Sequence, residues 1–157
     1  MAENNNHLQS QVRPSERAKG VAAIQSLLRL MSLMRDCYPQ DDFEKVAVFL
    51  SVVSASTGWT LRDKQLLRGM GAGPLPDGLQ RHISARAVAE SLAMPRETVR
   101  RKLRELAASG KIIEGPEGFR IPSDAIHKDR NLEFCRGIVA EFQAAPRRIS
   151  QFDELDG

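Results

Sequence analysis

The stretch ISARAVAESLAMPRETVRRKLRELAASGKIIEGPEGFRI, residues 83–121, decides the fold that the sequence predicts. It begins with a predicted short helix, because Ser84 is a residue type that caps helices by accepting backbone N–H bonds. One face of that helix is apolar and carries Ala85, Val88, Ala89 and Leu92. Ala93-Met94 predicts a tight turn. Pro95 then predicts the first residue of a second helix, where its missing N–H costs nothing.

The second helix, expected over residues 95–108, divides into an apolar and a charged side. Val99, Leu103 and Leu106 lie at i, i+4 and i+7, so they form one stripe that must be buried. With helical periodicity, the side opposite the stripe and its two flanks are then polar or charged. The opposite side presents Glu97, Arg101 and Arg104, one flank presents Arg96 and Arg100, and the other presents Thr98 and Lys102.

Two short strands around the tip Glu114-Gly115-Pro116-Glu117-Gly118 are expected to follow this helix. This order of elements predicts a winged helix-turn-helix, whose second helix enters the major groove of DNA. Residues 81–121 hold nine Lys and Arg against five Asp and Glu, a surplus of +4 compared with +3 for the whole chain. The basic charge is therefore concentrated where phosphate binding needs it. A merely solvated face would explain arginines on an arbitrary helix, but the capped helix before it and the hairpin after it favour nucleic-acid recognition.

Residues 94–101, MPRETVRR, together with Leu103 and Leu106, resemble the recognition helix of Crp/Fnr-type bacterial regulators. The usual core of that helix reads Ser-Arg-Glu-Thr-Val-x-Arg. The resemblance implies that Arg96, Glu97 and Arg101 read base edges. The chemistry agrees, because Arg can donate a fork to guanine O6 and N7, and Glu can accept from cytosine N4.

The segment is also similar to GntR-type winged helices, which share Arg-x-Thr-x-x-Arg in part. That alignment implies contacts from Arg86, Arg96, Thr98 and Arg100. Both alignments select Arg96, and they differ over Arg100 and Arg101. The predicted DNA-binding residues are therefore Arg86, Arg96, Glu97, Thr98, Arg100, Arg101, Arg104 and, from the hairpin, Arg120.

The chain departs from these families at three points. Ala93 stands where glycine is common, which costs about 1 kcal/mol if the turn needs a positive φ. The hairpin tip is acidic, so Lys111 and Arg120 are the only basic residues of the predicted wing. Residues 1–80 show no cyclic-nucleotide β-roll, and residues 122–157 are too few for a GntR effector domain, so neither family's sensing route is expected.

The segments on either side of residues 80–122 predict helices. Residues 1–14 are polar and expected to be disordered, residues 15–68 are expected to form a helical dimerisation region, and residues 69–79 a Gly/Pro linker. A C-terminal helix is expected over residues 123–145, ended by Ala145-Pro146, with a mobile tail over 146–157. The apolar residues between Val21 and Met34 are more numerous than one side of a small core can cover. Such flanking helices are similar in architecture to those of MarR-type regulators.

Composition excludes several other classes of protein. The 157 residues suffice for one domain, and the two cysteines, Cys37 and Cys135, stand in no metal-ligand or redox motif. The sequence contains no recognisable cofactor-binding motif and no recognisable group of catalytic residues, so an enzyme is not expected. Polar residues 1–20 predict no secretory signal, and no apolar run reaches a bilayer span, so a cytoplasmic protein without membrane contact is expected.

Two functions remain in competition. The first is a DNA-binding transcription regulator that acts as a homodimer, since a two-fold dimer addresses two half-sites one DNA turn apart. A small-molecule effector pocket between the apolar helices and the DNA-binding module would suit such a regulator. The second is a winged-helix adaptor that binds proteins in a larger assembly. The acidic tip favours the adaptor, whereas the exposed arginines favour DNA.

Overall fold

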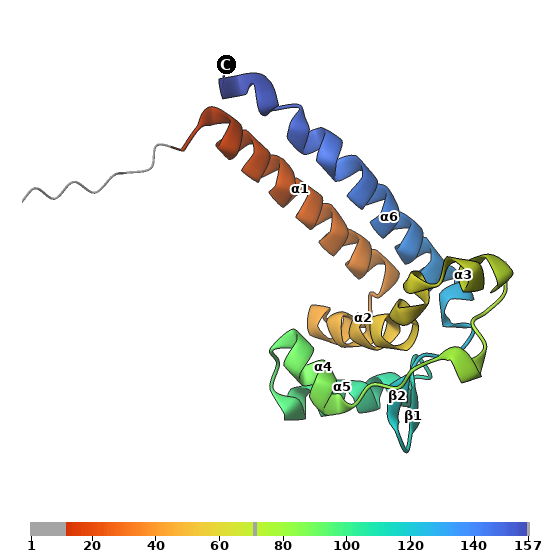
Figure 1. Ribbon diagram of the computed structural model, residues 1–157. Helices are drawn as coiled ribbons and strands as arrows, with labels where there is room; N and C mark the ends of the chain where they lie inside the picture. Colours follow the sequence, from red (N-terminus) through yellow and green to blue (C-terminus); the bar gives the residue numbers. More distant parts are fainter. Residues whose placement is uncertain (1–11, 71, 157) are drawn as a thin grey trace, which may run out of the picture. The chain divides into compact units, whose positions relative to one another are not determined.

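The computed structural model describes residues 12–70 and 72–156 (Figure 1). It is mainly helical with one small antiparallel sheet of two strands, which confirms the predicted mainly-α class with a hairpin. The chain divides into two compact units. One is continuous and spans residues 33–136, and the other combines the described residues before 33 with those after 136. Helices α1 (Pro14–Cys37) and α6 (Asp129–Ser150) contribute to both.

Helix α2 (Phe43–Thr57) is the central helix of the continuous unit. Asp42 caps its start by accepting from the backbone N–H of Lys45 at 2.7 Å. Val46, Val48, Phe49 and Val52 are all buried. The β-branched residues in this segment are also typical of strands. The segment is nevertheless a helix, and this helix is buried on several sides.

We call the predicted Gly/Pro linker, residues 69–79, the glycine-rich segment. Its described residues are more ordered than those of a flexible linker. A 3-10 helix (Gly58–Arg62) precedes it, helix α3 (Lys64–Met70) ends at its start, and a second 3-10 turn (Asp77–Leu79) lies within it. Leu75 is buried, and the indole N–H of Trp59 donates to the Leu79 carbonyl at 2.9 Å. Burial of this one leucine and the Trp59 bond hold the segment against the unit, which glycine and proline content alone did not reveal.

Helices α4 (Ala85–Leu92) and α5 (Arg96–Ala108) are followed by strands β1 (Ile113–Gly115) and β2 (Gly118–Arg120). The strands pair in antiparallel register, with Glu114 opposite Phe119. Ile83, just before α4, exchanges both backbone hydrogen bonds with Phe119 at 2.9 Å and so extends the sheet by one bridge. The core shared by these elements and α2 contains Val88, Val99, Leu103, Leu106, Ile112 and Phe119.

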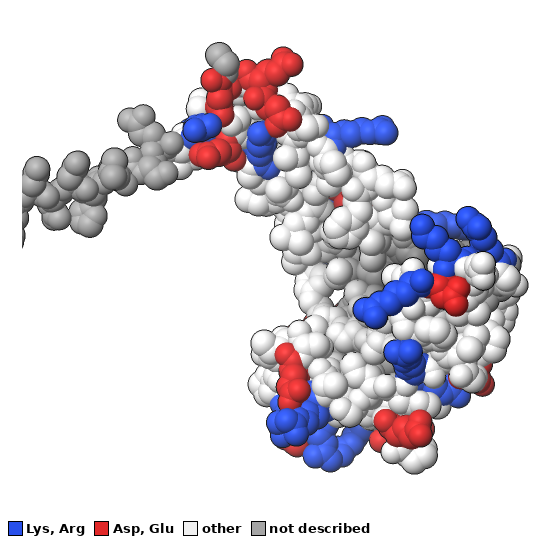
Figure 2. Space-filling model, in the orientation of Figure 1, with Lys and Arg blue, Asp and Glu red and all other residues white. Residues whose placement is uncertain are grey.

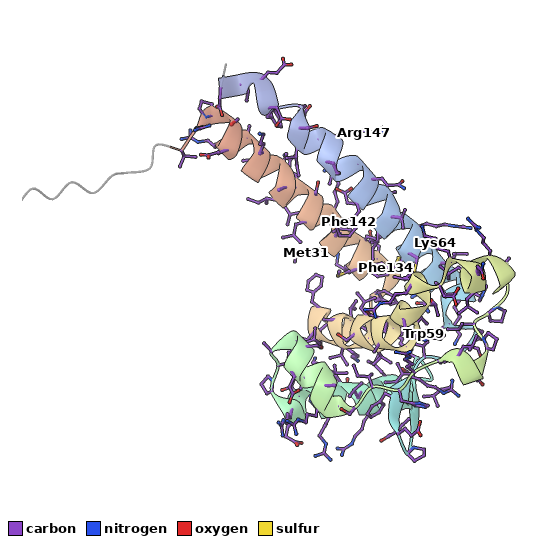
Figure 3. All side chains as sticks on the ribbon, viewed as in Figure 1. Met31, Trp59, Lys64, Phe134, Phe142 and Arg147 are labelled. Carbon is purple, nitrogen blue, oxygen red and sulfur yellow. The ribbon has the colours of Figure 1, made fainter. Side chains whose placement is uncertain are left out.

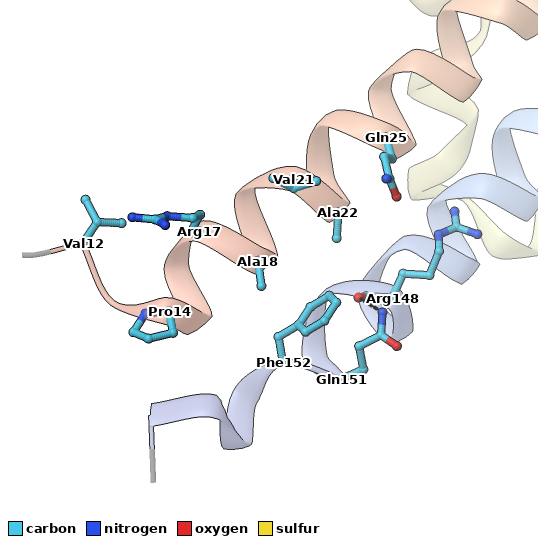
Figure 4. A pocket seen from close by; sticks show the side chains of 10 residues that line it. All are labelled: Val12, Pro14, Arg17, Ala18, Val21, Ala22, Gln25, Arg148, Gln151 and Phe152. Atoms are coloured by element: carbon cyan, nitrogen blue, oxygen red, sulfur yellow. Dashed lines mark hydrogen bonds between the residues drawn. The ribbon is translucent and has the colours of Figure 1, made fainter.

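In the second unit, α1 and α6 run antiparallel (Figure 1). Ser15 hydrogen-bonds to Asp156, Lys19 pairs with Asp153 at 2.6 Å, and Arg148 donates to Ser26 at 3.5 Å. Figure 4 shows the groove between the start of α1 and the residues that end α6 and follow it, where the Phe152 ring points toward Ala18 and Ala22. The face of α1 turned toward α6 is therefore made of small residues: Ser15, Ala22 and Ser26 are buried.

The larger apolar residues of this unit point to solvent. On α1, Val21, Ile24, Leu27 and Leu28 are each more than half exposed, and on α6 so are Val139 and Phe142, the latter labelled in Figure 3. We call these six residues the apolar surface of α1 and α6. The sequence predicted an apolar surface too wide for one small core, and this unit leaves it uncovered.

The predicted C-terminal helix has different bounds in the structure. Helix α6 begins at Asp129, after a 3-10 turn (Ala125–His127), and continues through Pro146 to Ser150. A further 3-10 turn (Asp153–Asp156) occupies the expected mobile tail. The expected end at Ala145-Pro146 was wrong: α6 includes Pro146, and contacts of Asp153 with Lys19 and of Asp156 with Ser15 hold the segment after the helix against α1.

The expected disorder of residues 1–14 lies mostly outside the described residues, and Pro14 already belongs to α1. Both cysteines are free thiols. Within the described part of the chain, no helix combines the length and apolar character that a bilayer crossing requires.

Candidate nucleic-acid interface

The turn between α4 and α5 has the geometry that the sequence predicted. Ser84 caps α4 by accepting from the backbone N–H of Ala87 at 3.1 Å. Ala93 ends α4 in the left-handed region, with φ 51° and ψ 37°. Its N–H and that of Met94 donate to the last turn of α4, at 3.4 Å to Glu90 and 3.0 Å to Ala89. A residue with a Cβ therefore occupies a conformation that favours glycine.

Pro95 is one position earlier than expected. It is the N-cap of α5, with φ −58° and ψ 134°, and α5 begins at Arg96. Its carbonyl already accepts from Val99 N–H at 3.1 Å, as an N-cap carbonyl does, while its ψ is extended. The proline thus sets the entry of the chain into α5, and Arg96 becomes the first residue of the helix.

The apolar stripe of α5 is buried as predicted. Val99, Leu103 and Leu106 are at most 1% exposed. This phase leaves Arg96, Arg100, Arg101 and Arg104 exposed along the other side of the helix. Arg86 on α4 is exposed as well, with 71% of its side chain accessible.

Lys102 is the exception to the predicted polar side. It was placed on a solvated flank, but only 2% of it is exposed. Its ammonium donates to both carboxylate oxygens of Asp42, at 2.8 and 2.9 Å, and lies 3.2 Å from Glu44. Lys102 therefore ties α5 to the N-terminus of α2, where the negative side chains also favour the helix dipole.

The pKa values of this pair reflect the contact. The hydrogen bond from Lys102 holds the pKa of Asp42 below its ordinary value, with help from the Lys45 N–H. Burial lowers the pKa of Lys102, but the hydrogen bonds that it donates to Asp42 and Glu44 outweigh burial and leave the pKa raised. Both shifts favour the charged pair.

A second ion cluster joins the same two helices farther along α5. Lys45 of α2 lies 3.0 Å from Glu105 and 3.3 Å from Asp41. Lys111, after α5, pairs with Asp41 and lies over the Tyr38 ring at 5.8 Å. The two clusters fix the orientation of α5 on α2, and only the acidic run Asp41-Asp42-x-Glu44 could have signalled them in the sequence.

The exposed arginines are accompanied by glutamates. Arg86 contacts Glu90 at 2.7 Å, Arg100 contacts Glu97 at 3.3 Å, and Arg101 contacts Glu105 at 2.9 Å. Arg96 lies 3.8 Å from Glu90. Figure 2 shows Lys and Arg gathered over α4 and α5 with acidic side chains beside them. Exposed pairs of this kind hold the side chains weakly and dissociate readily when a phosphate competes.

Two other predicted site residues differ from these. Thr98 is half-buried at the edge of the exposed side of α5. Arg120 is held at the base of the hairpin: its guanidinium donates to Asp77 at 3.0 Å and to the Ile121 carbonyl at 3.2 Å, and only 17% of the side chain is exposed. The structure therefore does not bring Arg120 together with the arginines of α5.

The charge available on the surface is smaller than the sequence count. Of the nine basic residues in 81–121, Lys102, Lys111 and Arg120 are bound to acidic residues outside that range. Glu105 is likewise bound to Lys45 outside the range, so six arginines remain against four glutamates and the surplus falls from +4 to +2. What distinguishes the surface is therefore the position of its arginines on one helix face rather than its net charge.

Among the described residues, no group of three or more His, Cys, Asp or Glu side chains is arranged to hold a metal ion. The chain matches no protein-family model, and neither the curated proteins nor the solved structures contain a significant match to it.

Proposed function

We propose that the chain is a sequence-specific DNA-binding transcription regulator that acts as a homodimer. In this proposal α4 and α5 form a helix-turn-helix, α5 enters the major groove, and β1, β2 and the Ile83 bridge form the wing. The observation that carries the proposal is the row of exposed arginines on α5, opposite a stripe that packs fully into the unit. A helix held in this way can present its outer face to base edges.

Arg96 is the residue best placed to read a base. It is the first residue of α5, and its side chain is 64% exposed and only loosely paired. Residues at the N-terminal end of a recognition helix reach farthest into the groove, and a guanidinium there can fork onto guanine O6 and N7. Glu97, whose side chain is 82% exposed, can accept from cytosine N4. Thr98, at the helix edge, suits a phosphate contact that carries no sequence information.

A protein–protein adaptor is the second candidate, and the hairpin tip favours it. Glu114 and Glu117 make the tip acidic, and phosphate would repel them. His82 lies 3.3 Å from Glu117, and a protonated imidazole would compensate the negative charge of this glutamate. With Arg120 bound at the hairpin base, the wing offers DNA little attraction, so the proposal relies on α4 and α5 alone.

The homodimer rests on the apolar surface of α1 and α6. All six of its residues are apolar and more than half exposed. Four of them follow one another at helical spacing on α1, and the other two lie on α6. Exposed apolar surfaces of this kind often mark sites where a protein associates with another protein. A second copy of the same surface would cover them, and the dimer would carry two copies of α5, as an operator with two half-sites requires.

The DNA-binding proposal is tested by selecting binding sites from a random duplex pool. Arg96→Ala should weaken binding to the selected site by about 1–3 kcal/mol and erase the preference at one base pair of each half-site. Thr98→Ala should weaken selected and random DNA equally. Arg68→Ala, an exposed arginine on α3, is the matched control and should change neither. Identical base preferences for wild type and Arg96→Ala would favour the adaptor instead.

The dimer is tested separately by sedimentation equilibrium at micromolar concentration. The wild-type chain should sediment at twice 17.5 kDa, and Ile24→Asp should sediment at 17.5 kDa, because a carboxylate would be buried against the partner. Leu61→Asp, at an even more exposed site in the other unit, should leave the dimer intact. A wild-type monomer would contradict this part of the proposal.

A further inference from the structure

The continuous unit contains a cavity of about 400 Å³, which lies within the range of roughly 300–1,000 Å³ that small-molecule sites occupy. All its lining residues fall between 38 and 135, so it belongs to this unit alone. They come from α2, the 3-10 helix after it, α3, the glycine-rich segment, the start of α6 and the residues just after α1 and β2. They include Tyr38, Phe49, Val53, Leu75, Ile121 and Phe134. Figure 3 labels Phe134 of the lining and Trp59, which belongs to the neighbouring 3-10 helix.

The lining has no charge: none of the described residues around the cavity is Asp, Glu, Lys, Arg or His. An ionised ligand would therefore lose its hydration without gaining a partner, which is costly. The aromatic rings supply shape, because Tyr38 meets Phe49 and Phe134 edge to face at 5.9 and 5.1 Å. Burial raises the pKa of Tyr38, so its hydroxyl stays neutral at any physiological pH.

The polar groups of the lining mostly donate to the protein itself. Tyr38 Oη donates to Asn131 at 2.9 Å, and Asn131 Nδ2 donates to the Ala125 carbonyl at 2.6 Å. Thr57 and Thr60 donate to backbone carbonyls at 2.8 and 2.7 Å. A hydroxyl that donates in this way still has lone pairs free, so these residues can accept a hydrogen bond from a ligand.

We propose that this cavity binds a small, neutral, mainly apolar molecule that donates one or two hydrogen bonds to the hydroxyl oxygens of the lining. The cavity opens to solvent beside apolar side chains. Leu61, Ile126 and Leu67 line it and are 72%, 48% and 39% exposed, so a ligand would enter there. A bound molecule would cover them, which explains why leucine and isoleucine stand exposed there.

The occupant would touch the elements that hold the hairpin and α5. Ile121 directly follows β2, and its N–H donates to Ser56 of α2 at 3.3 Å. Helix α2 in turn carries Asp42, the partner of Lys102 on α5. Control of DNA binding by the ligand would follow from these contacts and rests on the proposed function, whereas ligand binding itself does not.

The experiment titrates the full-length chain with N-phenyl-1-naphthylamine, a neutral apolar fluorophore with one N–H donor. The matched probe is 8-anilinonaphthalene-1-sulfonate, which has the same ring system with an added sulfonate. The neutral probe should bind once per chain, and the sulfonate should bind at least about tenfold more weakly, because the charge enters an uncharged lining. Equal affinities, or several equivalent sites, would overturn the proposal.

Substitutions then locate the site. Val53→Phe should fill the cavity and reduce affinity for the neutral probe at least about tenfold. Leu61→Asp at the exposed entrance should also reduce it several-fold and does not threaten the fold. Ile24→Asp makes the same kind of change on the apolar surface of α1 and α6 and should leave probe binding unchanged. If Leu61→Asp has no effect, or if Ile24→Asp abolishes binding, the probe binds elsewhere and the cavity is not the site.

Discussion

The contact between Asp42 and Lys102 should respond very differently to loss of one partner or the other. Asp42→Ala removes the N-cap of α2, which costs about 1 kcal/mol. It also removes two charge-assisted hydrogen bonds of a lysine that is 2% exposed, and such bonds contribute about 1.5–3 kcal/mol. Glu44 remains at 3.2 Å as a partner, and the Asp42 side chain is 60% exposed, so the lower values apply. The substitution should destabilise the continuous unit by about 2–3 kcal/mol.

Lys102→Met should cost much less, about 0–1 kcal/mol. Methionine keeps most of the buried stem and removes the ammonium together with its desolvation penalty. The carboxylates left behind are more than half exposed and can be hydrated. For the same reason, Lys102→Met introduced into Asp42→Ala should restore part of the lost stability, because the second change removes the charge that the first left with a single partner.

The assay is urea unfolding of the four proteins, followed by far-UV circular dichroism and by the fluorescence of Trp59. Lys64→Met, at an exposed position on α3, is the matched control for loss of a lysine and should have almost no effect. The reasoning is refuted if Lys102→Met is as damaging as Asp42→Ala, or if the double variant is less stable than Asp42→Ala alone.

Three further predictions follow from backbone geometry and charge. Ala93→Gly should stabilise the chain by about 1 kcal/mol in urea unfolding, because Ala93 holds φ at 51°; an unchanged midpoint would mean that the turn is not strained. Gly118→Ala should destabilise the hairpin by about 2–3 kcal/mol, since φ is 122° and a Cβ would lie 2.5 Å from the Ile83 carbonyl oxygen; hydrogen exchange at Phe119 that stays slow would contradict this. The lowered pKa of Asp42 means that its contribution is complete above about pH 4 and lost as the pH falls through its folded value, so Asp42→Asn should flatten the acid side of the stability profile.

Local signals in the sequence located most of the helices. The caps at Ser84 and Asp42 both form the bonds that their residue types predict. The apolar period of α5 gave the correct buried side. A positive φ at Ala93 was left open by the sequence, and the structure shows it. These features depend on residues at most a few positions apart.

The features that sequence reasoning missed depend on residues far apart. Lys102 is buried because carboxylates 60 positions earlier meet it, and Arg120 is withdrawn from solvent by an aspartate 43 positions earlier. Periodicity assigns each of them to an exposed side and cannot indicate a distant partner. Helix α6 continues past Pro146, where Arg148 contacts Ser26 of α1, and this contact also joins residues far apart in the sequence. Homodimer formation and base reading stay predictions.

The unit built from both ends of the chain has a consequence for the order of folding. Its two segments are separated by residues 33–136, and closing an unstructured loop of that length costs about 4 kcal/mol. Folding of the continuous unit removes most of this cost, because Tyr38 near its start then contacts Asn131 and Phe134 near its end. During synthesis, residues 33–136 can fold as soon as they emerge, whereas α1 must wait for the residues of α6 and the 3-10 turn after it. The surface proposed for pairing two copies is therefore assembled after the segment proposed to bind DNA has formed.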